Sequence, residues 1–237
     1  MQLAKEHVRW GFEKMRQAIK RKGYSWNHKR IRRVYCELKL NLRIKPKKRL
    51  PARERQVLAQ PVKPNYCWSL DFMSDALING ERFRTLNILD DFNREVLGIL
   101  ANKCLPARRV VEYLDFIGSY RRYPKIIRVD NGPEFISKEF AKWACERGIV
   151  INHIQPGKPA QNAYIERFNR TYREDILDLY MFDSVAEVQN ITDKWLIKYN
   201  NDRPHESLNN LTPIEFGSFH EGIAHHGNKV KNKKSLL

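Results

Sequence analysis

Three acidic residues are spaced so that a fold of strands and helices would bring their carboxylates to one place: Asp71, Asp130 and Glu166. Asp71 falls in an expected strand, on the face opposite Trp68 and Leu70. Asp130 ends a later strand, and Glu166 lies on the helix after a Pro/Gly loop. Because open α/β sheets bind ligands at the carboxyl ends of their strands, the three side chains are expected to face a common site.

Carboxylate oxygens are hard ligands that suit Mg²⁺, with Mn²⁺ as an alternative, and Mg²⁺ keeps waters and completes its shell with substrate phosphate. Two such ions about 3.5 to 4 Å apart would stabilise the attacking and leaving oxygens of an in-line displacement. The pattern therefore predicts phosphodiester cleavage or transfer without a side-chain nucleophile. Each carboxylate alone is weaker evidence, since an Asp before Asn-Gly is more often a turn former.

The helix that carries Glu166 has two distinct faces, because residues three and four apart lie on the same side. The polar face holds Asn162, Glu166, Asn169, Arg170 and Arg173. The apolar face holds Ile165, Phe168, Tyr172 and Ile176. Glu166 should therefore look toward a site with basic neighbours.

Alternation and periodicity predict the elements that position these residues. Strands are expected at 67–73, 83–89, 96–101, 126–129 and 149–154. Helices are expected at 106–120, 137–147, 160–179 and 184–200, the last begun by a capping box of Ser184 and Glu187. Two further helices, 4–22 and 27–40, come before a linker rich in proline, lysine and arginine.

The charge is concentrated at the N-terminal end. The chain of 237 residues has 44 Lys and Arg against 27 Asp and Glu, a net charge of +17. Residues 1–70 hold 20 of these basic and 4 of these acidic residues. Such a segment gains affinity for a polyphosphate by releasing counterions, so DNA or RNA is favoured over a solvated face or an anionic membrane surface. No apolar run approaches a membrane span, and the four cysteines show no zinc or disulfide spacing, which favours the cytoplasm.

The three acids and their surroundings resemble the DDE signature of bacterial insertion-sequence transposases related to retroviral integrases. The matching elements are Asp71, then Val129-Asp130-Asn131-Gly132-Pro133-Glu134-Phe135, then Glu166 with 35 residues between Asp130 and Glu166. Residues 153–169 look like that family's loop and catalytic helix, and Arg173 matches its basic residue seven positions after the glutamate. Residues 199–208, followed by Thr212-Pro213, resemble its closing motif. The resemblance covers residues 66–217.

The resemblance implies an α/β, RNase H-like (integrase core) fold with a mixed five-stranded sheet flanked by helices, preceded by a small basic helical module. The expected divisions are a DNA-binding module at 1–58, a linker at 59–65, a catalytic core at 66–220 and a basic disordered tail at 221–237. In this family a first reading frame often carries a helix-turn-helix and a coiled coil. The chain has no sustained heptad, so that part is expected to be absent here.

The activity implied is that of a polynucleotidyl transferase that nicks DNA at the element ends and joins the 3′-hydroxyl to target DNA, with two Mg²⁺ or Mn²⁺ ions held by Asp71, Asp130 and Glu166. The partners expected are element-end and target DNA, further copies of the chain on that DNA, and the upstream-frame product, in the cytoplasm at the nucleoid. Residues 22–49 are expected to follow the DNA backbone. The side chains predicted to contact DNA are Lys29, Arg30, Arg32, Arg33, Lys158, Arg170 and Arg173.

Two other functions remain open on the sequence: an RNase H-like nuclease that does not join strands, and a catalytically silent DNA-binding regulator. Four further acids, Asp75, Asp90, Asp91 and Asp202, are expected in surface or turn roles because they fall outside the matching positions. Glu134 is expected to orient Asn131 or DNA rather than a metal, and His153 either to contact phosphate or to serve a structural role.

Overall fold

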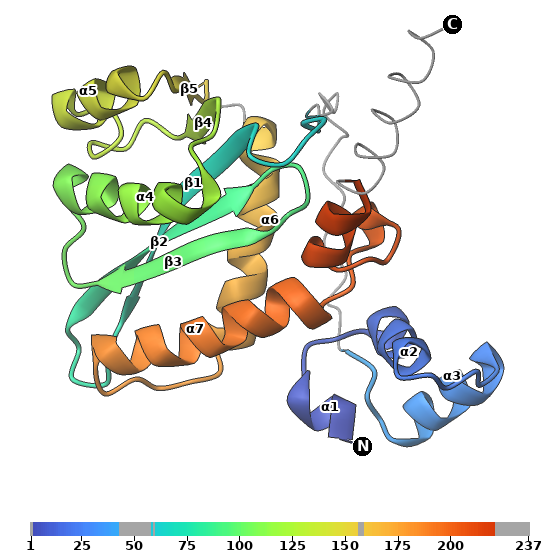
Figure 1. The fold of residues 1–237 in the computed structure, drawn as a ribbon. Helices are drawn as coiled ribbons and strands as arrows, with labels where there is room; N and C mark the ends of the chain where they lie inside the picture. The colour runs from blue at the N-terminus through green and yellow to red at the C-terminus, as the bar shows by residue number, and fades with distance from the viewer. Residues whose placement is uncertain (1, 43–57, 59, 156–158, 221–237) are drawn as a thin grey trace, which may run out of the picture.

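A mixed five-stranded sheet forms the centre of the protein (Figure 1). The computed structural model describes residues 2–42, 58, 60–155 and 159–220. Its strands are β1 (Cys67–Ala76), β2 (Arg82–Asp90), β3 (Val96–Asn102), β4 (Ile126–Val129) and β5 (Val150–His153), in the order β3-β2-β1-β4-β5. The first three strands pair antiparallel, and β1, β4 and β5 pair parallel. The predicted α/β class and strand sequence are confirmed.

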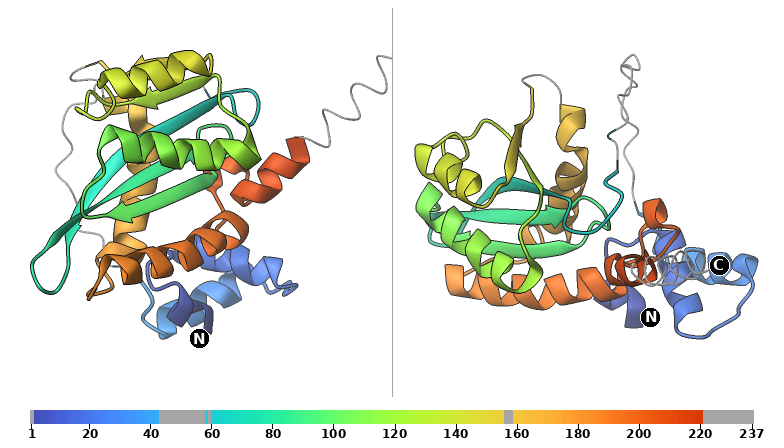
Figure 2. Two further views of the ribbon diagram at one scale, coloured as in Figure 1. Left: turned by 60° about the vertical axis from the view of Figure 1, so that its left-hand side comes forward. Right: turned by 45° about the horizontal axis from the view of Figure 1, so that its top comes forward.

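Helices cover both faces of this sheet (Figure 2). One face carries α4 (Ala107–Arg121) and α5 (Lys138–Glu146). The other carries α6 (Ala163–Tyr172) and α7 (Val185–Asp202). Half of the capping box predicted for α7 is present, because the hydroxyl of the N-cap residue Ser184 accepts from the Glu187 N–H at 3.2 Å. The Glu187 carboxylate accepts instead from the N–H of Asp183, one residue before the N-cap, at 2.8 Å.

Alternation along the strands divides the core into two clusters, one on each face of the sheet. On the first face Trp68, Leu70 and Ile127 pack against Leu114 of α4 and Phe140 of α5. The second face is covered by the apolar side predicted for the helical segment 160–179. Ile165, Phe168 and Tyr172 of α6 and Ile176 after it are all buried there.

The segment expected as one helix at 160–179 consists of three pieces. A 3-10 turn at Pro159–Asn162 leads into α6, which continues as a π-helix at Arg173–Leu177. The π-helix shifts the register of the side chains after Tyr172, so the polar face predicted for an ideal helix is not continuous through Arg173. Among the described residues, no helix is long and apolar enough to cross a membrane.

The N-terminal module has three helices, α1 (Gln2–Glu6), α2 (Phe12–Arg21) and α3 (His28–Glu37). The single helix expected at 4–22 is therefore wrong. The chain turns between α1 and α2, where the His7 and Trp10 rings stack at 3.7 Å and Gly11 takes an extended conformation as the N-cap of α2. This turn buries Trp10, which a continuous helix could not direct into the small core of the module. The helix expected at 27–40 corresponds to α3, which begins where predicted, with the Asn27 side chain accepting from the Lys29 N–H at 2.8 Å.

Two adjacent acids, Asp90 and Asp91, are buried at the end of β2, which corrects the surface role expected for Asp91. The Asp91 carboxylate pairs with the Arg128 guanidinium of β4 at 2.5 Å and accepts from the Ser69 hydroxyl at 2.6 Å. Asp90 does act as a turn former, accepting from the N–H groups of Asn65 at 2.7 Å and Phe92 at 2.9 Å. These bonds replace the water that a surface carboxylate would have kept.

Replacing Arg128 by Met should destabilise the protein by about 3 to 5 kcal/mol, because the buried Asp91 carboxylate would lose its counter-charge. Urea unfolding of the wild type and the variant measures this difference. Adding Asp91→Asn to Arg128→Met should recover a large part of the loss. A double variant no more stable than the single one would contradict a charge-based penalty.

Candidate active site

The register of the sheet brings Asp71 and Asp130 next to each other. Strands β1 and β4 pair parallel with Ser69 opposite Arg128, and two further residues along each strand lead to Asp71 and Asp130. On its other side Asp71 lies opposite Asn87 of β2. Two acids far apart in the sequence thus meet at one edge of the central strands, as their predicted positions required.

Asp71 is held by a chain of side-chain amides. Its Oδ2 accepts from Asn169 Nδ2 at 2.7 Å, and Asn169 Oδ1 accepts from Asn87 Nδ2 at 2.7 Å. Its Oδ1 accepts from the Phe72 N–H at 2.9 Å. Burial raises the pKa of Asp71 to about 6, the charges of Asp130 and Glu166 add to the rise, and the bonds from Phe72 and Asn169 oppose it.

Asp130 follows β4 in a tight turn. Its Oδ1 accepts from the Gly132 N–H at 2.9 Å, so the carboxylate is fixed by the backbone of the Asn-Gly step. A β-carbon at position 132 would lie 3.0 Å from that same oxygen, which explains glycine here. The ring nitrogen Nδ1 of His153, on β5, lies 3.3 Å from the Asp130 carbonyl oxygen. His153 therefore contacts the turn that carries Asp130.

Glu166 stands on the first turn of α6, and its side chain is exposed. Helix α6 packs against β1 and β2, which places Glu166 close enough for its charge to raise the Asp71 pKa. Within the described residues no group of three or more His, Cys, Asp or Glu side chains is clustered tightly enough to hold a metal ion. The three acids share one region, since the charges of Asp130 and Glu166 both act on Asp71, but in the described residues they do not form a closed ligand set.

Two residues around this region, Asn169 and Arg84, were not assigned roles from the sequence. Asn169 belonged to the predicted polar face, but its 8% exposure and its bond to Asp71 show that it faces the sheet. The Arg84 guanidinium pairs with Glu134 and lies 4.1 Å from the centre of the Phe72 ring. Glu134, expected to orient Asn131 or DNA, pairs with Arg84, and its role toward DNA stays a prediction. Only the fold brings β2 to these positions, so sequence spacing could not reveal the contacts.

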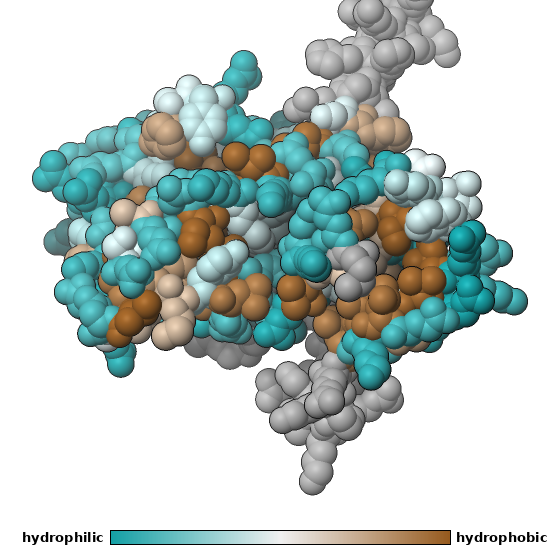
Figure 3. Space-filling model, turned by 90° about the horizontal axis from the view of Figure 1, so that it is seen from below, coloured by the Kyte–Doolittle hydropathy of each residue, from teal (hydrophilic) through white to brown (hydrophobic). Residues whose placement is uncertain are grey.

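The side chains predicted to contact DNA lie in different settings. On α3, Lys29, Arg30, Arg32 and Arg33 are all exposed. Arg170 is exposed on α6, whereas Arg173 is engaged with Asp75 at 3.1 Å and with the Ser74 carbonyl at 3.0 Å. Lys158 lies outside the described residues. Apolar side chains also gather on the face of the protein seen from below (Figure 3). Val34 and Leu38 are exposed apolar residues of the module.

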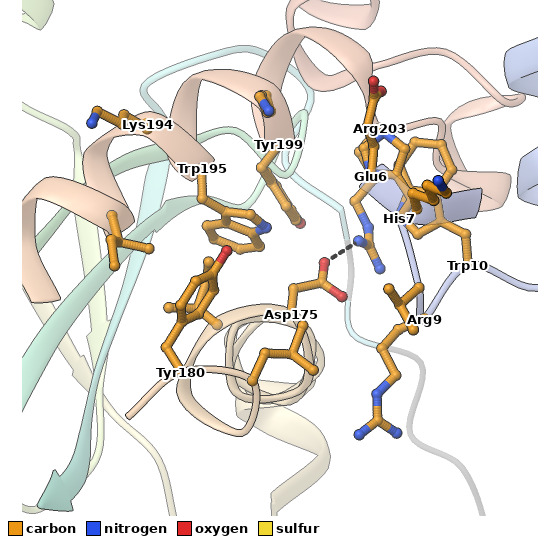
Figure 4. Close-up of a pocket in the computed structure, with 16 residues that line it drawn as sticks. Glu6, His7, Arg9, Trp10, Asp175, Tyr180, Lys194, Trp195, Tyr199 and Arg203 are labelled. Carbon is orange, nitrogen blue, oxygen red and sulfur yellow. Dashed lines mark hydrogen bonds and ion pairs between the residues drawn. The ribbon is translucent and has the colours of Figure 1, made fainter. Parts of the chain in front are cut away.

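A groove of about 500 Å³ lies between the N-terminal module and the part of the protein built on the sheet. Figure 4 shows Trp195, Tyr199 and Tyr180 on one side and Arg9 and Trp10 on the other. The Arg203–Asp175 ion pair, at 2.6 Å, lies between the two sides. The Arg203 guanidinium is 6.0 Å from the centre of the Trp10 ring and 5.7 Å from that of Tyr199. Arg203, from the predicted closing motif, thus joins the core to the module.

His205, two residues further along the closing motif, is in an unusual electrostatic position. Its Nε2 atom is buried and has no hydrogen-bond partner among the described residues. Burial lowers the pKa of His205 to about 3, and the charges of Arg203, Lys14, Arg94 and Arg167 lower it further. The imidazole is therefore neutral in the folded protein near pH 7.

Comparisons with known proteins agree with this architecture. Two families described as Integrase core domain match residues 61–159 and 147–213, and one described as HTH-like domain matches residues 1–48. The HTLV-2 integrase catalytic core domain, solved in complex with magnesium in a trimeric form, gives a TM-score of 0.50. It has 19% identity over 66% of this chain and 98% of that domain. The fold is therefore the RNase H-like fold of integrase cores.

The similarity to insertion-element proteins extends over most of the chain. The chain is 40% identical over 224 residues to the insertion element IS407 uncharacterized 31.7 kDa protein of Burkholderia multivorans, and the match covers 94% of this chain and 81% of that protein. It is 38% identical over 218 residues to the IS476 uncharacterized 39.2 kDa protein of Xanthomonas euvesicatoria, covering 92% and 63%. The chain belongs to the bacterial insertion-sequence transposases with an integrase core domain.

Family membership confirms the predicted transposase class and implies polynucleotidyl transferase activity. One expectation is corrected. The helix-turn-helix was expected to be absent, but residues 1–48 match an HTH-like domain. The expectation rested on the lack of heptads, which concerns a coiled coil and says nothing about short helices joined by turns.

The buried His205 should make the protein lose stability as the pH falls. An imidazole with a pKa lowered to about 3 in the folded state takes up its proton mainly on unfolding once the pH drops below the ordinary value of 6.5. Between about pH 6 and 5 this group should cost about 1 kcal/mol of unfolding free energy per pH unit. Urea unfolding at several pH values should give a shallower slope for His205→Gln than for the wild type.

The exposed His28 on α3 supplies the matched control, since His28→Gln should keep the wild-type slope. Equal slopes for the wild type and His205→Gln would contradict the assignment of a buried neutral imidazole.

Proposed function

We propose that this transposase cuts DNA at the ends of its insertion element and joins the freed 3′-hydroxyl to target DNA, with Asp71, Asp130 and Glu166 as the catalytic residues. The observation that carries the proposal is the crowding of three carboxylates: the charges of Asp130 and Glu166 both raise the pKa of Asp71. Carboxylates that repel one another at a sheet edge are stabilised by a shared cation or by protonation. Because the family acts on DNA phosphates, a shared cation explains the placement of the three carboxylates better than protonation does.

The donor set fits Mg²⁺ or Mn²⁺, because all three side chains offer only hard oxygen atoms. Asp71, Asp130 and Glu166 would hold two ions. When bound, the ions would polarise the scissile phosphate and activate water or a 3′-hydroxyl. Support comes from the HTLV-2 integrase core, which was solved in complex with magnesium.

The chain's own residues would prepare this site before DNA arrives. Asn169 keeps one Asp71 oxygen engaged, and the Gly132 N–H fixes Asp130. Glu166 is exposed on the first turn of α6, so a rotamer change or a small shift of the helix would move it toward the other two acids. DNA engagement would complete the site, which fits acids that share a region without forming a closed cluster.

The module would hold DNA beside the catalytic core. The exposed Lys29, Arg30, Arg32 and Arg33 on α3 would contact backbone phosphates. Lys158, Arg170 and Arg173 are proposed as further DNA contacts near the acids, with Arg173 leaving Asp75 to do so. We place residues 1–58 as the DNA-binding module, 59–65 as a linker, 66–220 as the catalytic core and 221–237 as a basic tail.

The assembly proposed on DNA contains several copies of this chain, acting in the cytoplasm at the nucleoid, with the upstream-frame product as a further partner. The trimeric form in which the HTLV-2 core was solved is consistent with self-association. One chain offers one set of three acids, whereas an element has two ends. Two ends therefore require at least two chains if each end is processed by one site.

Replacing Asp130 by Asn should abolish both nicking and joining, lowering product formation by at least about a thousandfold, because the variant removes one charge at the centre of the site. The assay uses labelled element-end DNA with Mg²⁺, and a gel separates nicked from joined product. DNA binding without Mg²⁺ should match the wild type.

The same assay separates the alternatives. A wild type that nicks without joining would be a nuclease, and one that binds without nicking would be a regulator. Full activity in Asp130→Asn would contradict its catalytic role.

Removing two α3 cations should weaken DNA binding and its dependence on salt. Each phosphate contact contributes about 0.9 to the slope of log affinity against log salt concentration, so Lys29→Ala/Arg30→Ala in the full chain should lower the slope by about 2. Fluorescence anisotropy between about 50 and 200 mM salt measures it. The exposed pair Arg108 and Arg109 on α4 supplies the control, as its double alanine variant should keep the wild-type slope. Equal slopes for both variants would remove α3 from the DNA contact.

A further inference from the structure

A small basic pocket, distinct from the groove of Figure 4, lies where the module, helix α6 and the closing motif meet. It has a volume of about 120 Å³. Lys14 comes from α2 of the module, Arg167 directly follows Glu166 on α6, and His205 comes from the turn after α7. The charged side chains that line it are Lys14, Arg94, Arg167, Arg203 and Glu206, together with the imidazole of His205 and the phenols of Tyr164 and Tyr199.

Four cations therefore line this pocket with one carboxylate, that of Glu206. Two of the cations are fixed in place. The Arg203 guanidinium is held by Asp175 at 2.6 Å, and the Arg94 guanidinium lies 3.4 Å from the centre of the Tyr164 ring. Fixed guanidinium groups bind an anion without losing side-chain freedom, so the positive potential here is preorganised.

His205, which lines the same pocket, has one side-chain nitrogen without a hydrogen-bond partner among the described residues. Its Nε2 atom is buried and has no partner among the described residues. A buried polar atom left unpaired costs free energy, which a ligand oxygen could recover. The neutral tautomer with its proton on Nε2 would donate to such an oxygen.

Lys14 gives a second sign that an anion belongs here. Burial lowers the pKa of its amine to about 8, and the neighbouring Arg203 and Arg167 act in the same direction, against Asp175 and Glu206. The lysine is thus held beside like charges in a partly desolvated position. An anion would relieve this repulsion.

We propose that the pocket between Lys14, Arg167 and His205 binds one phosphate group of the DNA backbone. The volume is about four times the ~30 Å³ that one water occupies in the liquid, which suits a single phosphate and is too small for a whole nucleotide. Arginine, lysine and an imidazole N–H are all donors to phosphate oxygens.

The choice of DNA as the source of the phosphate rests on the proposed function. A phosphate held here would contact the HTH-like module through Lys14 and the catalytic helix through Arg167, next to Glu166. The closing motif would then have a role that the three acids do not provide, because it would bind the DNA backbone between the module and the core.

The test measures binding of the full chain to a short DNA duplex of arbitrary sequence, without divalent metal. Lys14→Met keeps the aliphatic stem and removes the charge. It should weaken binding, and the loss should shrink by about three- to fourfold between about 50 and 200 mM salt, as for one phosphate contact. Lys20→Met, on the same helix and outside the pocket, is the matched control and should bind like the wild type.

Acetylation of lysines, followed by mass spectrometry, gives a second readout that does not depend on the variant folding well. In the wild type, DNA should protect Lys14 and leave Lys20 reactive. Protection by inorganic phosphate but not by DNA would overturn the DNA assignment in favour of a small anion. A wild-type salt dependence for Lys14→Met without protection of Lys14 by DNA would overturn the site. Neither readout measures cleavage. A chain that proves inactive in the cleavage assay but shows the predicted protection of Lys14 would support the phosphate site and contradict only the proposed transposition chemistry.

Discussion

Burial of Asp71 beside the carboxylates of Asp130 and Glu166, at the junction of β1, β4 and α6, is the constraint on which the active region depends. Asp71 is half-buried beside two other acids, and its pKa of about 6 reports the cost of that position. The amide chain from Asn87 through Asn169 offsets part of the cost by donating to Asp71. A fold that only needed stability would place a neutral side chain there. The energy stored at this edge is available to stabilise a bound cation.

The rest of the core supports this arrangement. Parallel pairing of β1 and β4 brings Asp71 and Asp130 to the same level, and packing of α6 across β1 and β2 supplies both Glu166 and Asn169. On the same helix, Arg167 lines the pocket that Lys14 of the module and His205 of the closing motif also line. One helix thus contacts both the proposed catalytic acids and the proposed phosphate pocket.

The sequence was sufficient for the strands, for the start of α7 at Ser184 and for the adjacency of Asp71 and Asp130, because these follow from local alternation, turn chemistry and spacing. It was insufficient where a contact joins distant segments. Burial of Asp91 against Arg128 depends on the pairing of β1 with β4, and the π-helix after Tyr172 was not indicated by the apolar spacing of the segment. The break between α1 and α2 was missed for a similar reason: Trp10 leaves the helix to enter a core made with α3. Asn169 was visible as a polar position, and its role became clear only from its partner.

Locating bound ions tests the central claim most directly. Crystals of the protein with element-end DNA and Mn²⁺, measured at the manganese absorption edge, would show each ion as an anomalous peak. If the three acids hold the catalytic ions, peaks are expected between the carboxylates of Asp71, Asp130 and Glu166, with the DNA phosphate completing the ligand shell. Manganese bound elsewhere, with the three carboxylates still apart around properly seated DNA, would contradict that claim.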